Sequence, residues 1–129
     1  MIIDDNLFDG LLAEAGENPR LRINMDLRNS GEDGSQRMLN ALLPGTAVPI
    51  HRHWESSETT VILRGRLFVV FYDDLGGQTA RFLLDPSLGN YGVQIPRGQW
   101  HSVEVVEPSV ILEMKEGRYA PLGPEDTMD

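Results

Sequence analysis

A series of short apolar segments, separated by turn signals, occupies most of the chain from residue 36 onward. The segments are rich in Val, Ile, Leu and aromatic residues, and Gly, Pro, Asn and Asp lie between them. Turns are expected at Arg64–Gly65 and at Glu107–Pro108, among other places. This pattern predicts an antiparallel β-sandwich or barrel. The segments read QRMLNALLP, TTVILR, RLFVVFYDD, ARFLLD, YGVQIP, HSVEVVE and SVILEMK.

One short helix is expected before these strands. Apolar residues recur at helical spacing, Asp4 and Asp5 stand at the start, and Gly16 with Pro19 ends the pattern. The positions on the apolar face are Leu7, Phe8, Leu11, Leu12 and Ala15.

The stretch from Arg20 to Arg28 alternates with period two and therefore predicts a strand with one apolar face. Its apolar side completes the barrel of its own chain or packs against a partner sheet, so a homodimer is one expectation. The apolar positions are Leu21, Ile23, Met25 and Leu27, and the polar positions include Asn24, Asp26 and Arg28.

A chain of 129 residues has the usual size of one compact domain. We expect a single domain over 1–129. Residues 1–19 would form a helical segment, 20–118 a β-barrel, and 119–129 an acidic, proline-containing tail of loose character.

Composition excludes several classes of function. The formal net charge of −9 argues against a non-specific grip on nucleic acid, and no segment is apolar enough to span a membrane. The acidic N-terminal start lacks the pattern of a secretory signal, so a cytoplasmic location is expected. Because the chain contains no cysteine, any bound metal must use nitrogen and oxygen ligands.

Two of the three histidines, His51 and His53, lie one residue apart. On an extended strand they project from the same face, as a pair of metal ligands requires. Glu58 follows after a polar interruption, and a turn at residues 55–57 would return its carboxylate to the imidazoles. His101 begins the segment HSVEVVE. Three imidazoles and a carboxylate would suit Fe, Mn, Ni, Co or Zn better than Ca or Mg.

The spacing of these residues resembles the two motifs of the cupin superfamily. Gly45, five residues, His51, Arg52, His53, four residues, Glu58, six residues and Gly65 follow the first motif. Gly89, Pro96, Gly98 and His101 resemble the second motif, although six residues separate Gly89 from Pro96 where five are usual. Val105 stands where many members carry Asn.

Across residues 7–126 the chain further resembles the WbuC-type cupin-fold metalloproteins, through PRLR, QRMLNALLPGT, FYDD and KEGRY beside the two motifs. The resemblance implies a small jelly roll and a divalent metal held by His51, His53, Glu58 and His101. It also implies a link to surface-polysaccharide biosynthesis.

Three functions follow as alternatives. The first is a metal-dependent enzyme, such as an isomerase or epimerase, acting on a small polar substrate such as a sugar or sugar nucleotide. The second is an iron-dependent dioxygenase, and the third is a non-catalytic module that binds or senses a small ligand. The side chains expected to contact that ligand are Asn40, Arg64, Tyr72, Gln94 and Trp100.

Overall fold

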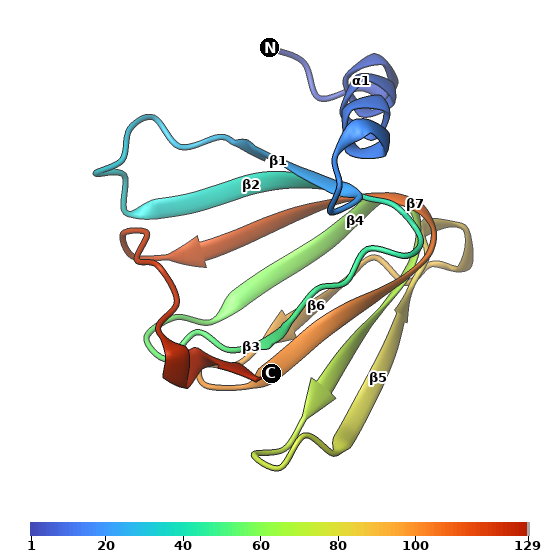
Figure 1. The fold of residues 1–129 in the computed structure, drawn as a ribbon. Coiled ribbons are helices and arrows are strands. Elements are labelled where there is room, and N and C mark those ends of the chain that lie inside the picture. Colours follow the sequence, from blue (N-terminus) through green and yellow to red (C-terminus); the bar gives the residue numbers. More distant parts are fainter. Residues whose placement is uncertain (129) are drawn as a thin grey trace.

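Antiparallel strands make up most of the regular secondary structure in the computed structural model, which describes residues 1–128 (Figure 1). One α-helix precedes the strands, and two short 3-10 helices lie between later ones. The elements are α1 (Asp5–Glu17), β1 (Arg22–Asp26), β2 (Ser35–Leu42), β3 (Ile50–His51), β4 (Glu58–Tyr72), β5 (Gln78–Leu84), η1 (Pro86–Leu88), β6 (Gly92–Ile95), β7 (Trp100–Glu116), η2 (Pro124–Asp126) and β8 (Thr127–Met128).

The two longest strands, β4 and β7, pair along nearly their whole lengths, from Glu58 opposite Lys115 to Tyr72 opposite Trp100. The turns expected at Arg64–Gly65 and Glu107–Pro108 are wrong, because both strands continue through these points. Register shifts between Ile62 and Leu67 form bulges there instead. Proline has no amide N–H for the ladder, and a bulge accommodates that loss without ending the strand.

These bulges divide each long strand between two layers (Figure 1). The first half of β4 and the second half of β7 pair with β6 and with β2, which also pairs with β1. The other halves pair with β5 and with β3. The expected class is confirmed as a mainly β, antiparallel fold with one short helix. Within residues 1–128 the sheet is open and not a closed barrel, because no pairing joins the outer strands β1, β5, β6 and β8 to one another.

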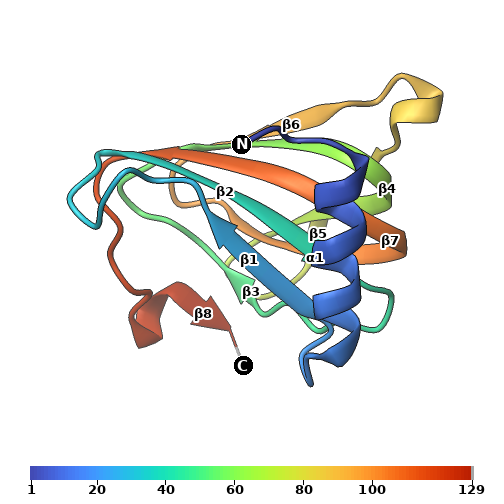
Figure 2. The same ribbon diagram turned by 90° about the horizontal axis from the view of Figure 1, so that it is seen from above.

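Helix α1 covers the outer face of the β1–β2–β7 layer (Figure 2). Its N-terminus is capped by Asp4, whose side chain accepts a hydrogen bond of 3.0 Å from the Leu7 amide. Phe8, Leu11 and Ala15 are buried against Leu39, Ala41 and Val110. The apolar side of β1 packs into this same cluster, so it is covered within its own chain.

A second apolar cluster packs between the two layers, and its members come mainly from β4 and β7. The chain end lies at the open side of this space (Figure 1). The tail was expected to be loose, but β8 pairs with β3 through Ile50–Met128 and His51–Thr127, because η2 turns the chain back toward β3. Among the described residues, no helix is both long and apolar enough to cross a membrane.

Candidate metal centre and its cavity

The pairing of β3 with β7 brings His101 next to His51 and His53, which are about fifty residues earlier in the sequence. His51 ends β3 and lies directly opposite His101 in the β3–β7 ladder, and His53 follows two residues after His51. The ring centroids of His51 and His101 are 4.3 Å apart, and that of His53 lies 5.2 and 5.7 Å from them. One ring nitrogen from each histidine lies within 4.8 Å of the other two, so a single ion could contact all three.

Backbone carbonyls fix the orientation of two of these rings. His51 Nδ1 lies 2.8 Å from Pro49 O, and His101 Nδ1 lies 2.9 Å from Gln99 O. A carbonyl accepts only from a protonated nitrogen, so both rings carry the proton on Nδ1 and expose the Nε2 lone pair. His101 Nε2 is buried and has no hydrogen-bond partner among residues 1–128. An unpaired lone pair next to two other imidazoles fits a metal ion.

The protonation of the histidines also favours metal binding. Burial, with a smaller contribution from the neighbouring His101, lowers the pKa of His51 to about 4. Burial likewise lowers the pKa of His53 to about 4, and the Lys115 ammonium has the same effect. Both rings are therefore neutral at pH 7, which is the form that ligates metals.

Glu58 lies at the His53 side of the cluster. Its Oε1 is 3.5 Å from both His53 Nε2 and Lys115 Nζ, and its Oε2 accepts a 2.9 Å hydrogen bond from Thr60 Oγ1. Burial opposes ionisation of Glu58, but Lys115 and the histidines hold the pKa of this carboxyl below its usual value. Glu58 is therefore an ionised oxygen donor beside the histidines, and Lys115 shares it.

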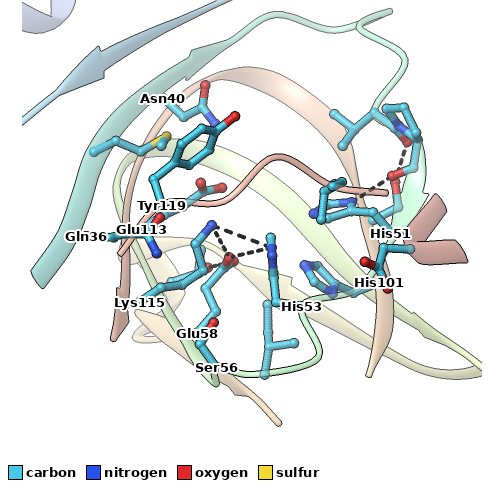
Figure 3. A pocket seen from close by; sticks show the side chains of 18 of the residues that line it. Gln36, Asn40, His51, His53, Ser56, Glu58, His101, Glu113, Lys115 and Tyr119 are labelled. Atoms are coloured by element: carbon cyan, nitrogen blue, oxygen red, sulfur yellow. Dashed lines mark hydrogen bonds and ion pairs between the residues drawn. The ribbon is translucent and has the colours of Figure 1, made fainter. Parts of the chain in front are cut away.

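The histidines open into a cavity of about 780 Å³ between the two layers. This volume lies in the range of small-molecule sites. Figure 3 shows His51, His53 and His101 on one side of the cavity, Glu58 and Lys115 in the middle, and Gln36, Asn40, Glu113 and Tyr119 on the other.

One of the five side chains expected to contact a ligand, Asn40, lines this cavity. The other four lie elsewhere. Arg64 pairs with Asp5 and Asp9 of α1 at 2.7 Å each, and Gln94 donates to Thr59 Oγ1 on the surface. Trp100 is buried and donates to Asp74 Oδ1, and the backbone carbonyl of Tyr72 accepts from Gln99.

Glu113 was missed by the sequence reasoning, although a signal for it exists. Residues 111, 113 and 115 continue the two-residue alternation that begins at His101, so Glu113 and Lys115 face the cavity with Ile111. The expected turn at Glu107–Pro108 interrupted that alternation and hid the connection. Tyr119 comes from the segment after β7, where no periodicity marks it.

Arg52, which lies between His51 and His53 in the sequence, connects the C-terminal segment to the candidate metal site. Its guanidinium carbon lies 4.1 and 4.2 Å from the ring centroids of Trp54 and Trp100. The same side chain pairs with Asp126 Oδ1 at 3.4 Å and donates to Glu125 O at 3.0 Å. Residues 118–122 and 125–127 thereby form one wall of the cavity.

The extra residue in the second motif is accommodated in a loop. Gly89 ends η1 with φ +79 and lies before β6. Strand β6 then pairs with β4 without a register shift, from Val61–Gly92 to Glu58–Ile95. The insertion therefore leaves the ladder next to Glu58 regular.

The fold is of the cupin type, as the likeness to three solved structures shows. CapF from Staphylococcus aureus, described as a capsular polysaccharide assembling protein, is 18% identical with a TM-score of 0.69; the match covers 86% of this chain and 32% of CapF. A cupin 2 domain-containing protein from Halorhodospira halophila is 18% identical with a TM-score of 0.60, and the match covers 80% and 70% of the two chains.

The third is an oxalate oxidase in complex with the substrate analogue glycolate, 21% identical with a TM-score of 0.66, where the match covers 92% of this chain and 63% of the other. The chain thus spans about a third of CapF and less than two thirds of the oxidase. By sequence, the chain belongs to the family described as a domain of unknown function, DUF6016, whose model matches residues 3–84. No curated protein matches the sequence.

Proposed function

We propose that this protein is a metal-dependent cupin enzyme of the WbuC type, acting in the cytoplasm on a small polar substrate such as a sugar or sugar nucleotide. One divalent transition ion, Fe, Mn, Ni, Co or Zn, would be held by His51, His53 and His101, with Glu58 as the fourth ligand. The observation that carries the proposal is the unpaired, buried His101 Nε2 beside two further imidazoles at the wall of a large cavity.

The chain's own residues have separate tasks in this proposal. The Pro49 and Gln99 carbonyls hold two rings with their lone pairs toward the ion. Lys115 and Thr60 keep Glu58 ionised and oriented. The bound ion would supply Lewis acidity toward a substrate oxygen. The link to surface polysaccharides is supported by the similarity to CapF, a capsular polysaccharide assembling protein.

The proposal is tested by measuring the metal content of protein purified without added metal or chelator, using elemental mass spectrometry. We expect about one ion per chain in the wild type and in the control Gln94→Leu, whose surface amide lies outside the cavity. His51→Ala and His101→Ala should each lose the ion. Glu58→Gln should weaken retention by about tenfold or more, because a neutral amide replaces the anionic donor. A metal-free wild type whose melting temperature rises with none of the five ions would overturn the proposal.

The same protein distinguishes the alternative functions. Turnover of a sugar nucleotide with a redox-inert ion supports the proposed enzyme. Oxygen consumption with ferrous iron and none with zinc would assign the chain to the dioxygenases instead. A ligand that raises the melting temperature without being changed would identify a binding module.

A homodimer through β1 also belongs to this proposal. Among residues 1–128, β1 pairs only with β2, so its second edge is free to pair with another copy. Sedimentation velocity should give a dimer mass, and a strict monomer at all concentrations would contradict it.

A further inference from the structure

The cavity has a second polar end, opposite the histidines, which we call the distal end (Figure 3). Gln36 and Asn40 reach it from β2, Glu113 from β7 and Tyr119 from the segment that follows β7. Nothing in the proposed metal site uses these side chains.

The distal end contains an unpaired polar atom of its own. Within residues 1–128, two buried side-chain polar atoms have no hydrogen-bond partner, and both belong to residues that line this cavity: His101 Nε2 and Asn40 Oδ1. Leaving a buried acceptor unpaired costs about 1–3 kcal/mol. A metal ion would satisfy His101, but Asn40 lies at the opposite end. Asn40 Oδ1 can therefore accept a hydrogen bond from a donor group that enters the cavity.

The partners of Asn40 define the kind of group that fits. Asn40 pairs with Ile111 in the β2–β7 ladder, so its side chain lies on the same cavity-facing side as that of Glu113, two residues further along β7. Burial, with a smaller contribution from the nearby Glu58 carboxylate, raises the pKa of Glu113 to about 7. Near neutral pH this carboxyl can both donate and accept a proton, whereas Asn40 Oδ1 only accepts. A hydroxyl group, which also donates and accepts, complements the pair.

The charges around the distal end disfavour an anion. Lys115 is paired with Glu58 at 3.5 Å. At the cavity rim, Arg97 pairs with Glu116 at 2.9 Å and Arg118 pairs with Glu32 at 2.6 Å. A phosphate or carboxylate placed here would face the Glu113 carboxyl and an amide oxygen. Among residues 1–128, the two lining arginines without a carboxylate partner, Arg20 and Arg22, lie at or just before the start of β1. Arg22 donates to Thr46 Oγ1 and Ala47 O.

We propose that the distal end binds an uncharged, hydroxyl-bearing group, with one hydroxyl donating to Asn40 Oδ1 and its neighbour bonded to the Glu113 carboxyl. A neutral pyranose has adjacent hydroxyls of this kind, and a cavity of about 780 Å³ accommodates it together with a group that extends toward the histidines. The inference rests on the proposed function only in that the metal ion at the histidines would act on the group that extends toward them.

Calorimetric titration with glucose, galactose and mannose, and with glucuronate and galacturonate, tests the inference on the full chain. We expect at least one neutral sugar to bind the wild type more tightly than its uronate does. Asn40→Leu removes the acceptor at similar volume and should weaken that binding by about tenfold or more. Glu113→Gln keeps the shape and should weaken it several-fold. The control Gln94→Leu makes the matched amide-to-leucine change outside the cavity and should bind like the wild type.

Three results would overturn the inference: no neutral sugar binds, the uronates bind more tightly, or Asn40→Leu binds like the wild type. If Asn40→Leu fails to fold, unchanged sugar affinity in Glu113→Gln overturns it alone. Metal content measured on the same samples separates this inference from the proposed function. A metal-free wild type with Asn40-dependent sugar binding refutes the metal enzyme and leaves the distal end intact. A metal-loaded wild type that binds none of the neutral sugars refutes the sugar site at the distal end and leaves the proposed metal site intact.

Discussion

Titratable residues inside the cavity give the metal-free protein opposing responses to pH. His51 and His53 have pKa values of about 4 in the fold against an ordinary 6.5, so the unfolded chain takes up protons first as pH falls. Their contribution to stability is therefore lost between about pH 6.5 and 4. Glu113 has its pKa raised to about 7 from 4.5, so its contribution is present below pH 4.5 and is lost as pH rises through 7.

Glu113→Gln isolates the second of these effects. A neutral amide needs no ionisation, so the variant should be more stable than the wild type at pH 8, by about 3 kcal/mol, with the difference vanishing near pH 4.5. Urea denaturation of both proteins with chelator present measures it. With the Glu113 contribution removed, acidification from pH 6.5 should also destabilise the variant more steeply than the wild type. Equal stability differences at pH 8 and 4.5 would show that Glu113 titrates normally.

Individual residues of the site were predictable to different degrees. The histidine cluster follows from sequence because a His-x-His pair on extended chain and a strand-initial His101 can share one face. Arg64 is different, since its position in β4 is equally compatible with the cavity or with α1, and the sequence does not state that Asp5 and Asp9 lie beneath it. Long-range ion pairs of this kind depend on how the helix docks.

At the scale of secondary-structure elements, the short strands β3 and β8 depend on side-chain contacts more than on their own ladder. Each has two residues, and an isolated pair this short has little stability. Arg52 supplies the missing connection through Asp126, the Glu125 carbonyl and two tryptophan rings. Because His51 lies in β3, the chain end and the candidate metal site are mechanically linked.

Arg52→Leu should therefore destabilise the protein by about 2 kcal/mol, the sum of a partly buried ion pair and two cation–π contacts. Amide hydrogen exchange of residues 125–128 should accelerate more than that of β4 and β7. Arg97→Leu is the matched control, because its single ion pair with Glu116 is exposed and should contribute less than about 0.5 kcal/mol. Equal stability losses in the two variants, or unchanged exchange in the tail, would contradict the linkage.

Element boundaries were the least predictable part of the fold. Gly65 and Pro108 are ordinary turn signals, yet here they mark bulges inside β4 and β7. Local sequence cannot distinguish a turn from a bulge, since the outcome depends on the strand opposite. The two-faced strand at residues 20–28 was easier, because its alternation alone fixes which side is buried.

At the scale of the whole molecule, the arrangement of the two layers depends on a close approach at one glycine. Gly65 has φ +94, and a Cβ at this position would collide with Pro108 O and lie 2.8 Å from Ser109 Cα. Both atoms belong to the backbone of β7. At this point the two long strands bend together from one layer into the other. A side chain at residue 65 would push these two strands apart. The cavity wall that carries Glu58 and Glu113 would move with them.

Gly65→Ala should consequently destabilise the protein by about 3 kcal/mol or more, from an unfavourable φ together with a backbone clash. Gly89→Ala is the control, because Gly89 also has positive φ, +79, but a Cβ there meets nothing within 4 Å. It should lose only the conformational term of about 1–2 kcal/mol. Urea denaturation of the two variants separates the cost of the steric clash from the cost of the positive φ. Both variants have the positive φ, and only Gly65→Ala has the clash. If the two variants lost equal stability, β4 and β7 could separate at this point without penalty, and the bend would not be what fixes the layers around the cavity.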